Sequence, residues 1–194
     1  MRKNTPKYLI VHHTGGNKED ALSDSSSLTF EDIDIDHRNN PNVWLGEYSS
    51  LGYAIGYHFY IDKTGKLTQG RADTDEGAHT IGYNTDSIGI CLAGNFDLTI
   101  PTTPQIVTLK QLLLKKMWDF NIGPEKIIPH RTFALKTCYG RHLADDWARS
   151  LVMQAMPVPD PCNGEKDEIV KKTSQIGRLQ QIVQDLLAVI TRKR

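Results

Sequence analysis

Short apolar runs separated by turn residues dominate the first hundred positions, a pattern typical of β-strands. The first run, residues 7–12, ends at a pair of histidines. The segment IGYHFYIDKTGKLTQGR, residues 55–71, predicts two strands joined by a turn at residues 62–65. Two further strands are predicted for SIGICLAG, residues 87–94, and for KIIP, residues 126–129.

The first strand of the predicted hairpin predicts the sheet face on which the Tyr57 side chain lies. Because side chains alternate between the two faces of a strand, Tyr57 should share a face with Phe59 and Ile61. His58 and Tyr60 should then point to the opposite face.

Helical periodicity appears in three other segments. Residues 30–39 form a predicted short helix, with Thr29 as N-cap and an acidic residue three positions later. Residues 104–120 show apolar side chains at helical spacing, with Thr103 as the expected cap. The segment LADDWARSLVMQAM, which follows residue 142, predicts another helix.

Strands interleaved with helices predict an α/β domain with a mixed central β-sheet flanked by helices. This domain is expected to span residues 1–156. The Pro-rich stretch 157–164 reads as a stiff linker. It leads to a C-terminal amphipathic helix over residues 165–194.

Apolar residues of the C-terminal segment recur every seven positions, which predicts a coiled-coil seam. We expect a homo-oligomer through residues 165–194, as a parallel dimer or a larger bundle; the alternative is that this helix packs on its own domain. The seam residues are Ile169, Ile176, Leu179, Val183, Leu186 and Ile190.

Charge and hydropathy narrow the possible partners. The chain of 194 residues has 23 basic and 23 acidic residues, so no overall field favours nucleic acid, and we expect no nucleic-acid partner. No stretch approaches the ~20 apolar residues of a membrane span. The apolar run near the N-terminus is too short for a signal-peptide core, so we expect synthesis in the cytoplasm without a signal peptide.

Two histidines and a cysteine suggest a metal site. His12 and His13 end one apolar strand, and His130 follows another, where α/β proteins collect functional side chains. Cys138 comes eight residues after His130. Two histidines and one cysteine suit a zinc centre whose fourth position holds water.

Four motifs occur along the chain in this order: YLIVHHT, GYHFYIDKTGKLTQGR, GAHTIGYNTDSIGICLAGNFD and PHRTFALKTC. From about Lys7 to Trp147 it resembles the zinc-dependent N-acetylmuramoyl-L-alanine amidase family, which includes phage endolysins and animal peptidoglycan recognition proteins. The resemblance implies the amidase/peptidoglycan recognition fold, in which helices flank a mixed central β-sheet. It also implies a Zn²⁺ cofactor and peptidoglycan or muropeptides as partners.

Carried over by position, the family's zinc ligands match His12, His130 and Cys138. The family's catalytic tyrosine matches Tyr57, and the lysine of its phage-type members matches Lys136. Zinc acidifies a coordinated water to a pKa near ~7 and polarises a carbonyl. A lysine can stabilise the oxyanion by roughly 3 kcal/mol, and the tyrosine can hydrogen-bond the water or the substrate.

Other residues receive weaker assignments. His79 and Asn84 match a loop beside the family's groove, so they are expected either to contact substrate or to stabilise a turn. His13 is expected to pack or support the site. Family members usually have proline after the ligand cysteine, whereas this chain has Tyr139, whose ring we expect near the metal.

The predicted function is hydrolysis of the amide bond between N-acetylmuramic acid and L-alanine, as in endolysins that act on the cell wall after release by an unknown route. One alternative is a recognition module that binds muropeptides without cutting them, although binding-only relatives commonly lack the cysteine. Another is a cytoplasmic muropeptide-recycling amidase. Members of that group generally use a carboxylate as third ligand, and this chain offers Cys138.

Overall fold

The fold was analysed in a computed structural model, which describes residues 2–17, 19–40 and 48–153. The predicted linker 157–164 and heptad helix 165–194 lie outside the described residues and stay predictions. Within the described part of the chain, no helix is long and apolar enough to cross a bilayer.

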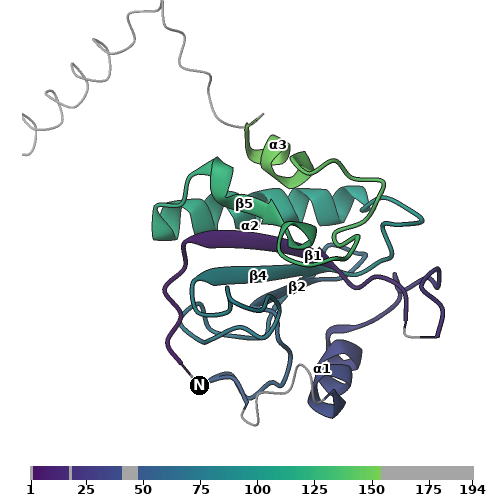
Figure 1. The fold of residues 1–194 in the computed structure, drawn as a ribbon, viewed down its shortest axis with the longest axis horizontal. Helices are drawn as coiled ribbons and strands as arrows, with labels where there is room; N and C mark the ends of the chain where they lie inside the picture. The colour runs from purple at the N-terminus through teal and green to yellow at the C-terminus, as the bar shows by residue number, and fades with distance from the viewer. Residues whose placement is uncertain (1, 18, 41–47, 154–194) are drawn as a thin grey trace, which may run out of the picture. The chain divides into compact units, whose positions relative to one another are not determined.

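Five strands form one mixed sheet in the order β3-β2-β4-β1-β5. All neighbouring strands run parallel except the hairpin pair β2 and β3. Figure 1 shows β1, β4 and β2 lying side by side. The α/β prediction is therefore confirmed. The strands are β1 (Tyr8–His13), β2 (Phe59–Ile61), β3 (Leu67–Gln69), β4 (Ser87–Leu92) and β5 (Ile127–Pro129).

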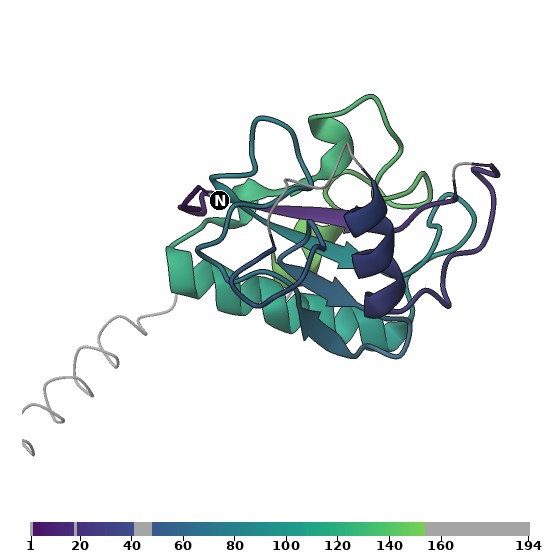
Figure 2. The same cartoon turned by 90° about the horizontal axis from the view of Figure 1, so that it is seen from below.

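Helices cover both faces of this sheet (Figures 1 and 2). The face under α2 (Thr103–Phe120) and α3 (Trp147–Met153) holds the larger core, which includes residues of β1, β2 and β4. The opposite face packs against α1 (Phe30–Asn39). Two single 3₁₀ turns, η1 (Pro124–Lys126) and η2 (His130–Thr132), flank β5.

The helix caps agree with the sequence at α1 and differ by one residue at α2. Thr29 and Asp32 form the predicted capping box of α1, each side chain accepting from the other residue's backbone N–H. At α2 the cap is Thr102, whose hydroxyl accepts from the backbone N–H of Gln105, so the prediction of Thr103 is wrong. Thr102 can cap because its backbone is extended, whereas Thr103 already has helical geometry.

The predicted face of Tyr57 is also corrected. Phe59 and Ile61 point into the core under α2, but Tyr57 packs with Tyr60 against the core under α1. The reason is that β2 begins only at Phe59, so strand alternation does not extend back to Tyr57. This places the Tyr57 ring on the side of the sheet where His12 lies, as the ring contact below shows.

Candidate metal centre

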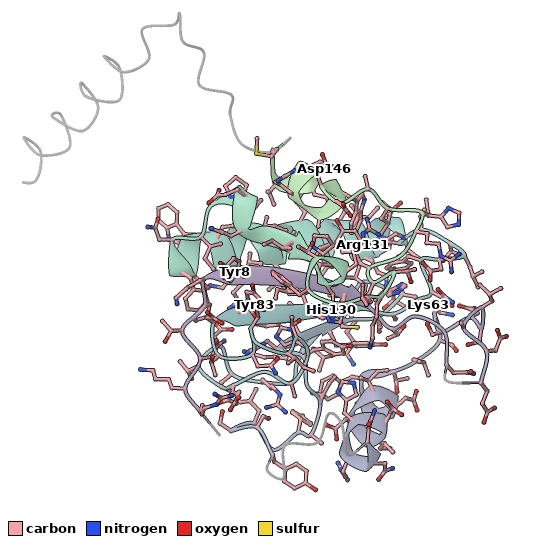
Figure 3. The ribbon with its side chains drawn as sticks, viewed as in Figure 1. Tyr8, Lys63, Tyr83, His130, Arg131 and Asp146 are labelled. Atoms are coloured by element: carbon pink, nitrogen blue, oxygen red, sulfur yellow. The ribbon has the colours of Figure 1, made fainter. Side chains whose placement is uncertain are left out.

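The carboxyl ends of two neighbouring parallel strands create the centre. β1 pairs with β5 in a register that sets Val11 beside Pro129, so the next residues, His12 within β1 and His130 directly after β5, come side by side. Their ring centroids are 4.4 Å apart. Figure 3 shows His130 at this end of the sheet. Strand pairing thus joins two histidines separated by more than a hundred residues.

Cys138 completes the cluster from the loop that follows His130. Its thiol lies against the end of β1, where the backbone N–H of His13 donates to Sγ at 3.4 Å. One ligand atom from each of His12, His130 and Cys138 lies within 4.8 Å of the other two. Ligands of a tetrahedral zinc sit about 3.5 Å apart, so small side-chain movements would close this set around the ion.

The protonation states of the two histidines favour metal binding. Burial lowers the pKa of His12 well below its usual value, and burial lowers that of His130 to about 4. Both rings are therefore neutral at pH 7, the form that coordinates metals. A borderline-soft donor set of two imidazoles and one sulfur suits zinc better than magnesium or calcium. The residues present fit the ion.

Cys138 differs because it holds its proton when no metal is bound. Burial raises the pKa of its thiol to about 12, although the His13 N–H and the charge of Lys136 oppose that rise. Thiolate is the form that binds zinc, so metal binding must displace this proton. The N–H of His13 is already in place to donate to the resulting thiolate, in agreement with the predicted supporting role of His13.

Arg131 holds the loop that carries Cys138. Its guanidinium donates to the carbonyls of Gly140 and Leu143, each at 2.7 Å. The Arg131 backbone N–H donates to the Cys138 carbonyl at 2.6 Å. Figure 3 shows Arg131 and His130 as neighbours in this loop. Sequence reasoning gave Arg131 no role, although its place directly after a ligand histidine was an available signal.

Two further anchors fix the same loop. The Asp97 carboxylate accepts from the Thr137 hydroxyl at 2.5 Å and from the Arg141 backbone N–H at 2.7 Å. On the other side, the Phe133 ring lies 3.9 Å from that of Tyr83, centroid to centroid. Neither anchor was assigned from sequence, and Asp97 closes one of the four family motifs. The loop that carries Cys138 is therefore anchored at several points.

A cavity of about 450 Å³ opens over the cluster. Its wall combines the three candidate ligands with both predicted catalytic residues. Gly15 and Gly16 of the loop after β1 form another part of the wall. The lining residues are His12, His13, Thr14, Gly15, Gly16, Asn17, Ala21, Tyr57, Asp97, His130, Lys136, Thr137, Cys138 and Arg141.

Tyr57 reaches the cavity between two histidines. Its ring centroid lies 5.0 Å from that of His12 and 5.2 Å from that of His37. Burial and the nearby thiols of Cys91 and Cys138 raise the pKa of the phenol well above its usual value. Tyr57 therefore stays protonated at neutral pH and can donate a hydrogen bond into the cavity.

Lys136 lines the cavity from the ligand loop and is exposed to solvent. Its positive charge is felt at all three candidate ligands, because it lowers the pKa of His12, His130 and Cys138 alike. A cation at this position can stabilise negative charge that develops on a substrate in the cavity.

His79 and Asn84 do not line this cavity. The Asn84 side-chain oxygen accepts from the backbone N–H groups of His79 and Thr80, at 3.0 and 2.8 Å, and so closes a turn. The His79 ring contacts His12, with 3.1 Å between Nδ1 and the His12 Nε2. Substrate contact by His79 and Asn84 stays a prediction.

His37, His58 and Tyr139 have structural roles. His58 is fully buried, and its Nδ1 accepts from the Gly89 N–H. The His37 Nδ1 accepts from the Gly56 N–H. The expectation for Tyr139 is wrong, because its ring lies in the core beside Trp147 and its hydroxyl donates to the carbonyls of Ala144 and Asp145. The Tyr139 side chain is buried in the hydrophobic core under α2 and α3 and does not line the cavity over the metal site.

Fold and site together define a mixed α/β domain with a His-His-Cys cluster at the carboxyl ends of its parallel strands. Residues 2–143 match the N-acetylmuramoyl-L-alanine amidase family, and the chain belongs to that family. The resemblance inferred from the four sequence motifs is therefore confirmed.

Relatives in the family are both insect and viral. Peptidoglycan-recognition protein SC2 of Drosophila melanogaster is 34% identical over 107 residues, covering 55% of this chain and 52% of that protein. The endolysin of Enterobacteria phage T3 is 32% identical over 101 residues, covering 50% of this chain and 66% of the endolysin. The chain thus spans about half the length of the insect protein that it matches.

Solved structures show the same fold. The endolysin N-acetylmuramoyl-L-alanine amidase LysCS from Clostridium intestinale aligns with a TM-score of 0.57 at 27% identity, over 73% of this chain and 82% of that one. The human recognition protein PGRP-IBETAC, solved with glycosamyl muramyl pentapeptide, aligns with a TM-score of 0.56 at 20% identity, over 73% and 82%. At 20% identity, the similarity to the human protein shows a shared fold and carries no information about function.

Proposed function

We propose that this protein is a zinc-dependent N-acetylmuramoyl-L-alanine amidase. It would hydrolyse the amide bond between the lactyl group of N-acetylmuramic acid and L-alanine in peptidoglycan. One observation carries the proposal: His12, His130 and Cys138 converge within 4.8 Å in a cavity that also contains Tyr57 and Lys136. A protein that only binds peptidoglycan does not need three metal-binding side chains next to the hydroxyl of Tyr57 and the charge of Lys136.

The roles of the residues follow from their positions. His12, His130 and Cys138 would hold the ion, which supplies Lewis acidity and an acidified water when bound. Lys136 places a positive charge at the cavity wall, where it stabilises the oxyanion formed as the amide carbonyl is attacked. Tyr57 donates from its protonated phenol to the substrate carbonyl or to the attacking water.

A peptidoglycan-binding module without activity is the second candidate, and the insect relative favours it by name. Binding and cleavage use the same cavity but differ in what they need from it. Recognition alone requires no acidic metal centre, so the complete donor set with Cys138 favours the enzyme. A recycling amidase is less well supported, because no carboxylate belongs to the donor set found among the described residues.

The site of action and the oligomeric state are part of the proposal. Similarity to a phage endolysin supports action on the cell wall. Self-association through residues 165–194 is tested by sedimentation of the chain with and without them. A monomer in both cases would exclude that role.

Digestion of purified sacculi tests the activity. The wild-type protein should release peptides from glycan strands, and a chelator should abolish the release until zinc is added back. His130→Ala and Cys138→Ala should lose both bound zinc and activity. His142→Ala, at an exposed histidine with no contact to the cavity, is the matched control and should retain both.

The competing functions predict different products. Binding of sacculi with no peptide release by zinc-loaded protein would identify a recognition module. Undiminished cleavage by the Cys138→Ala protein would refute the zinc mechanism. Cleavage of soluble anhydro-muropeptides with intact sacculi left uncut would identify a recycling amidase.

A further inference from the structure

The His79 ring occupies a space that two glycines leave open. A Cβ on Gly89, in the middle of β4, would lie 2.5 Å from carbons of the His79 ring. A Cβ on Gly77 would also come within 2.5 Å of it. No side chain fits at either position while the imidazole is there. The fold therefore reserves this space for the His79 ring, next to the candidate ligand His12.

Hydrogen bonds fix which nitrogen of His79 carries the proton. The Ser87 hydroxyl donates to the Tyr83 carbonyl at 2.6 Å, which leaves the Ser87 oxygen as an acceptor. His79 Nε2 lies 3.5 Å from that oxygen, at the long end of the hydrogen-bond range, and donates to it. With the proton on Nε2, the neutral ring has its lone pair on Nδ1.

The lone pair of His79 in turn decides the tautomer of His12. His12 Nε2 lies 3.1 Å from His79 Nδ1, so an accepting Nδ1 requires a proton on His12 Nε2. The Thr80 hydroxyl, 3.0 Å from the same Nδ1, is compatible with this arrangement, because a hydroxyl can donate there as well. His12 Nδ1 then carries the free lone pair, since a neutral imidazole holds one proton.

We propose that His79 is a positioning residue that holds His12 as the Nε2–H tautomer and so presents its Nδ1 to the metal. The inference rests on the proposed function, because it takes His12 as a zinc ligand. Metal-binding histidines generally donate their second N–H to a fixed acceptor, and removing that acceptor weakens metal binding. Here the acceptor is another imidazole, carried by a turn that Asn84 closes.

The tautomer is tested in metal-free protein, independently of zinc. Long-range ¹H–¹⁵N correlation spectra of the wild type should show His12 and His79 each protonated at Nε2 and unprotonated at Nδ1. His79→Leu should change the His12 Nε2–H signal and speed its exchange with water. Protonation of His12 at Nδ1 in the wild type would overturn the inference, whatever zinc does.

Zinc affinity tests the consequence, by competition with a chromophoric chelator. His79→Leu should bind zinc about 10- to 100-fold more weakly than wild type. His79→Asn should stay within about threefold, because its side-chain oxygen stands the same number of bonds from Cβ as Nδ1. His142→Leu, the same substitution at an exposed histidine, should have wild-type affinity.

The outcomes separate the two proposals. Equal affinity of His79→Leu and wild type, or equal losses in the Leu and Asn variants, would overturn the role of His79 and leave the amidase proposal intact. A wild type that binds no zinc would refute the zinc-amidase proposal, and the metal-free spectra would still decide the tautomer.

Discussion

At a pH below the pKa of ~7 of a zinc-bound water, zinc binding to this site should release one proton, and that proton should come from Cys138. Burial raises the pKa of this thiol to about 12 from an ordinary value of 9. At pH 7 the thiol is therefore about five pH units below its pKa, and its deprotonation costs about 7 kcal/mol at 1.36 kcal/mol per unit. The metal–thiolate bond must offset this cost whenever zinc binds.

The two candidate histidine ligands, His12 and His130, should contribute no proton near neutrality. The pKa of His130 lies at about 4 and that of His12 well below its usual value, both because of burial. Between pH 5 and 6, below the pKa of ~7 of a zinc-bound water, only Cys138 changes its protonation on binding. The apparent association constant for zinc should then rise about tenfold per pH unit across this range. Below about pH 4 the dependence should steepen as His130 becomes protonated.

Competition titrations against a zinc indicator of known affinity at each pH would measure this slope. Calorimetry in two buffers of different ionisation enthalpy would count the released protons directly. Cys138→Ala should bind zinc more weakly and with little pH dependence between pH 5 and 6, because only neutral histidines remain. A wild-type slope near zero would mean that Cys138 is not the ligand or is already ionised. A slope near two between pH 5 and 6 would mean that a candidate histidine ligand is protonated in this range.

Three further predictions concern rate and stability. Lys136→Ala should retain zinc and lose about 10²- to 10³-fold in kcat, as removal of an oxyanion-stabilising group does; unchanged kcat on sacculi would exclude that role. Tyr139→Ala should lower the free energy of unfolding by about 3–5 kcal/mol, and Tyr139→Phe by about 1 kcal/mol, in urea titrations of zinc-free protein; equal losses would show that the hydroxyl, rather than the ring, dominates. Burial lowers the pKa of His37 and His58 to about 4, below the 6.5 of the unfolded chain, so their stabilisation is complete above pH 6.5 and is lost as pH falls toward 4. At pH 4 the lowered pKa of each histidine should reduce the free energy of unfolding by up to about 3 kcal/mol. Replacing His58 should therefore flatten the measured pH dependence of the free energy of unfolding between pH 6.5 and 4.

Features that depend on local chemistry were predictable. The α1 capping box follows from the spacing of Thr29 and Asp32, because a capping box is closed by residues three positions apart. The existence of the strands and of α2 follows from apolar periodicity, whereas their ends are less well predicted: the α2 cap differs by one residue and β2 begins only at Phe59. Motif order identified the family, since each motif marks a strand end or a loop that the fold uses.

Features that depend on packing between distant segments were not predictable. The face of Tyr57 depends on where β2 begins, which is set by pairing with β3 and β4. Nothing near Tyr139 in the sequence indicates that α3 will cover its ring. The hold of Arg131 on carbonyls up to twelve residues away likewise exists only once the loop has closed.

The sequence by itself determined the family, the element types and the residues that could bind a metal, because those depend on residue type, spacing and order. The tertiary structure decided which of them meet. Parallel pairing of β1 with β5 brings His12 to His130, and the closed loop brings Cys138 to both. It also turned His79 from a candidate substrate contact into a neighbour of His12, because the space left by Gly77 and Gly89 is visible only when β4 and the loop before it are packed together.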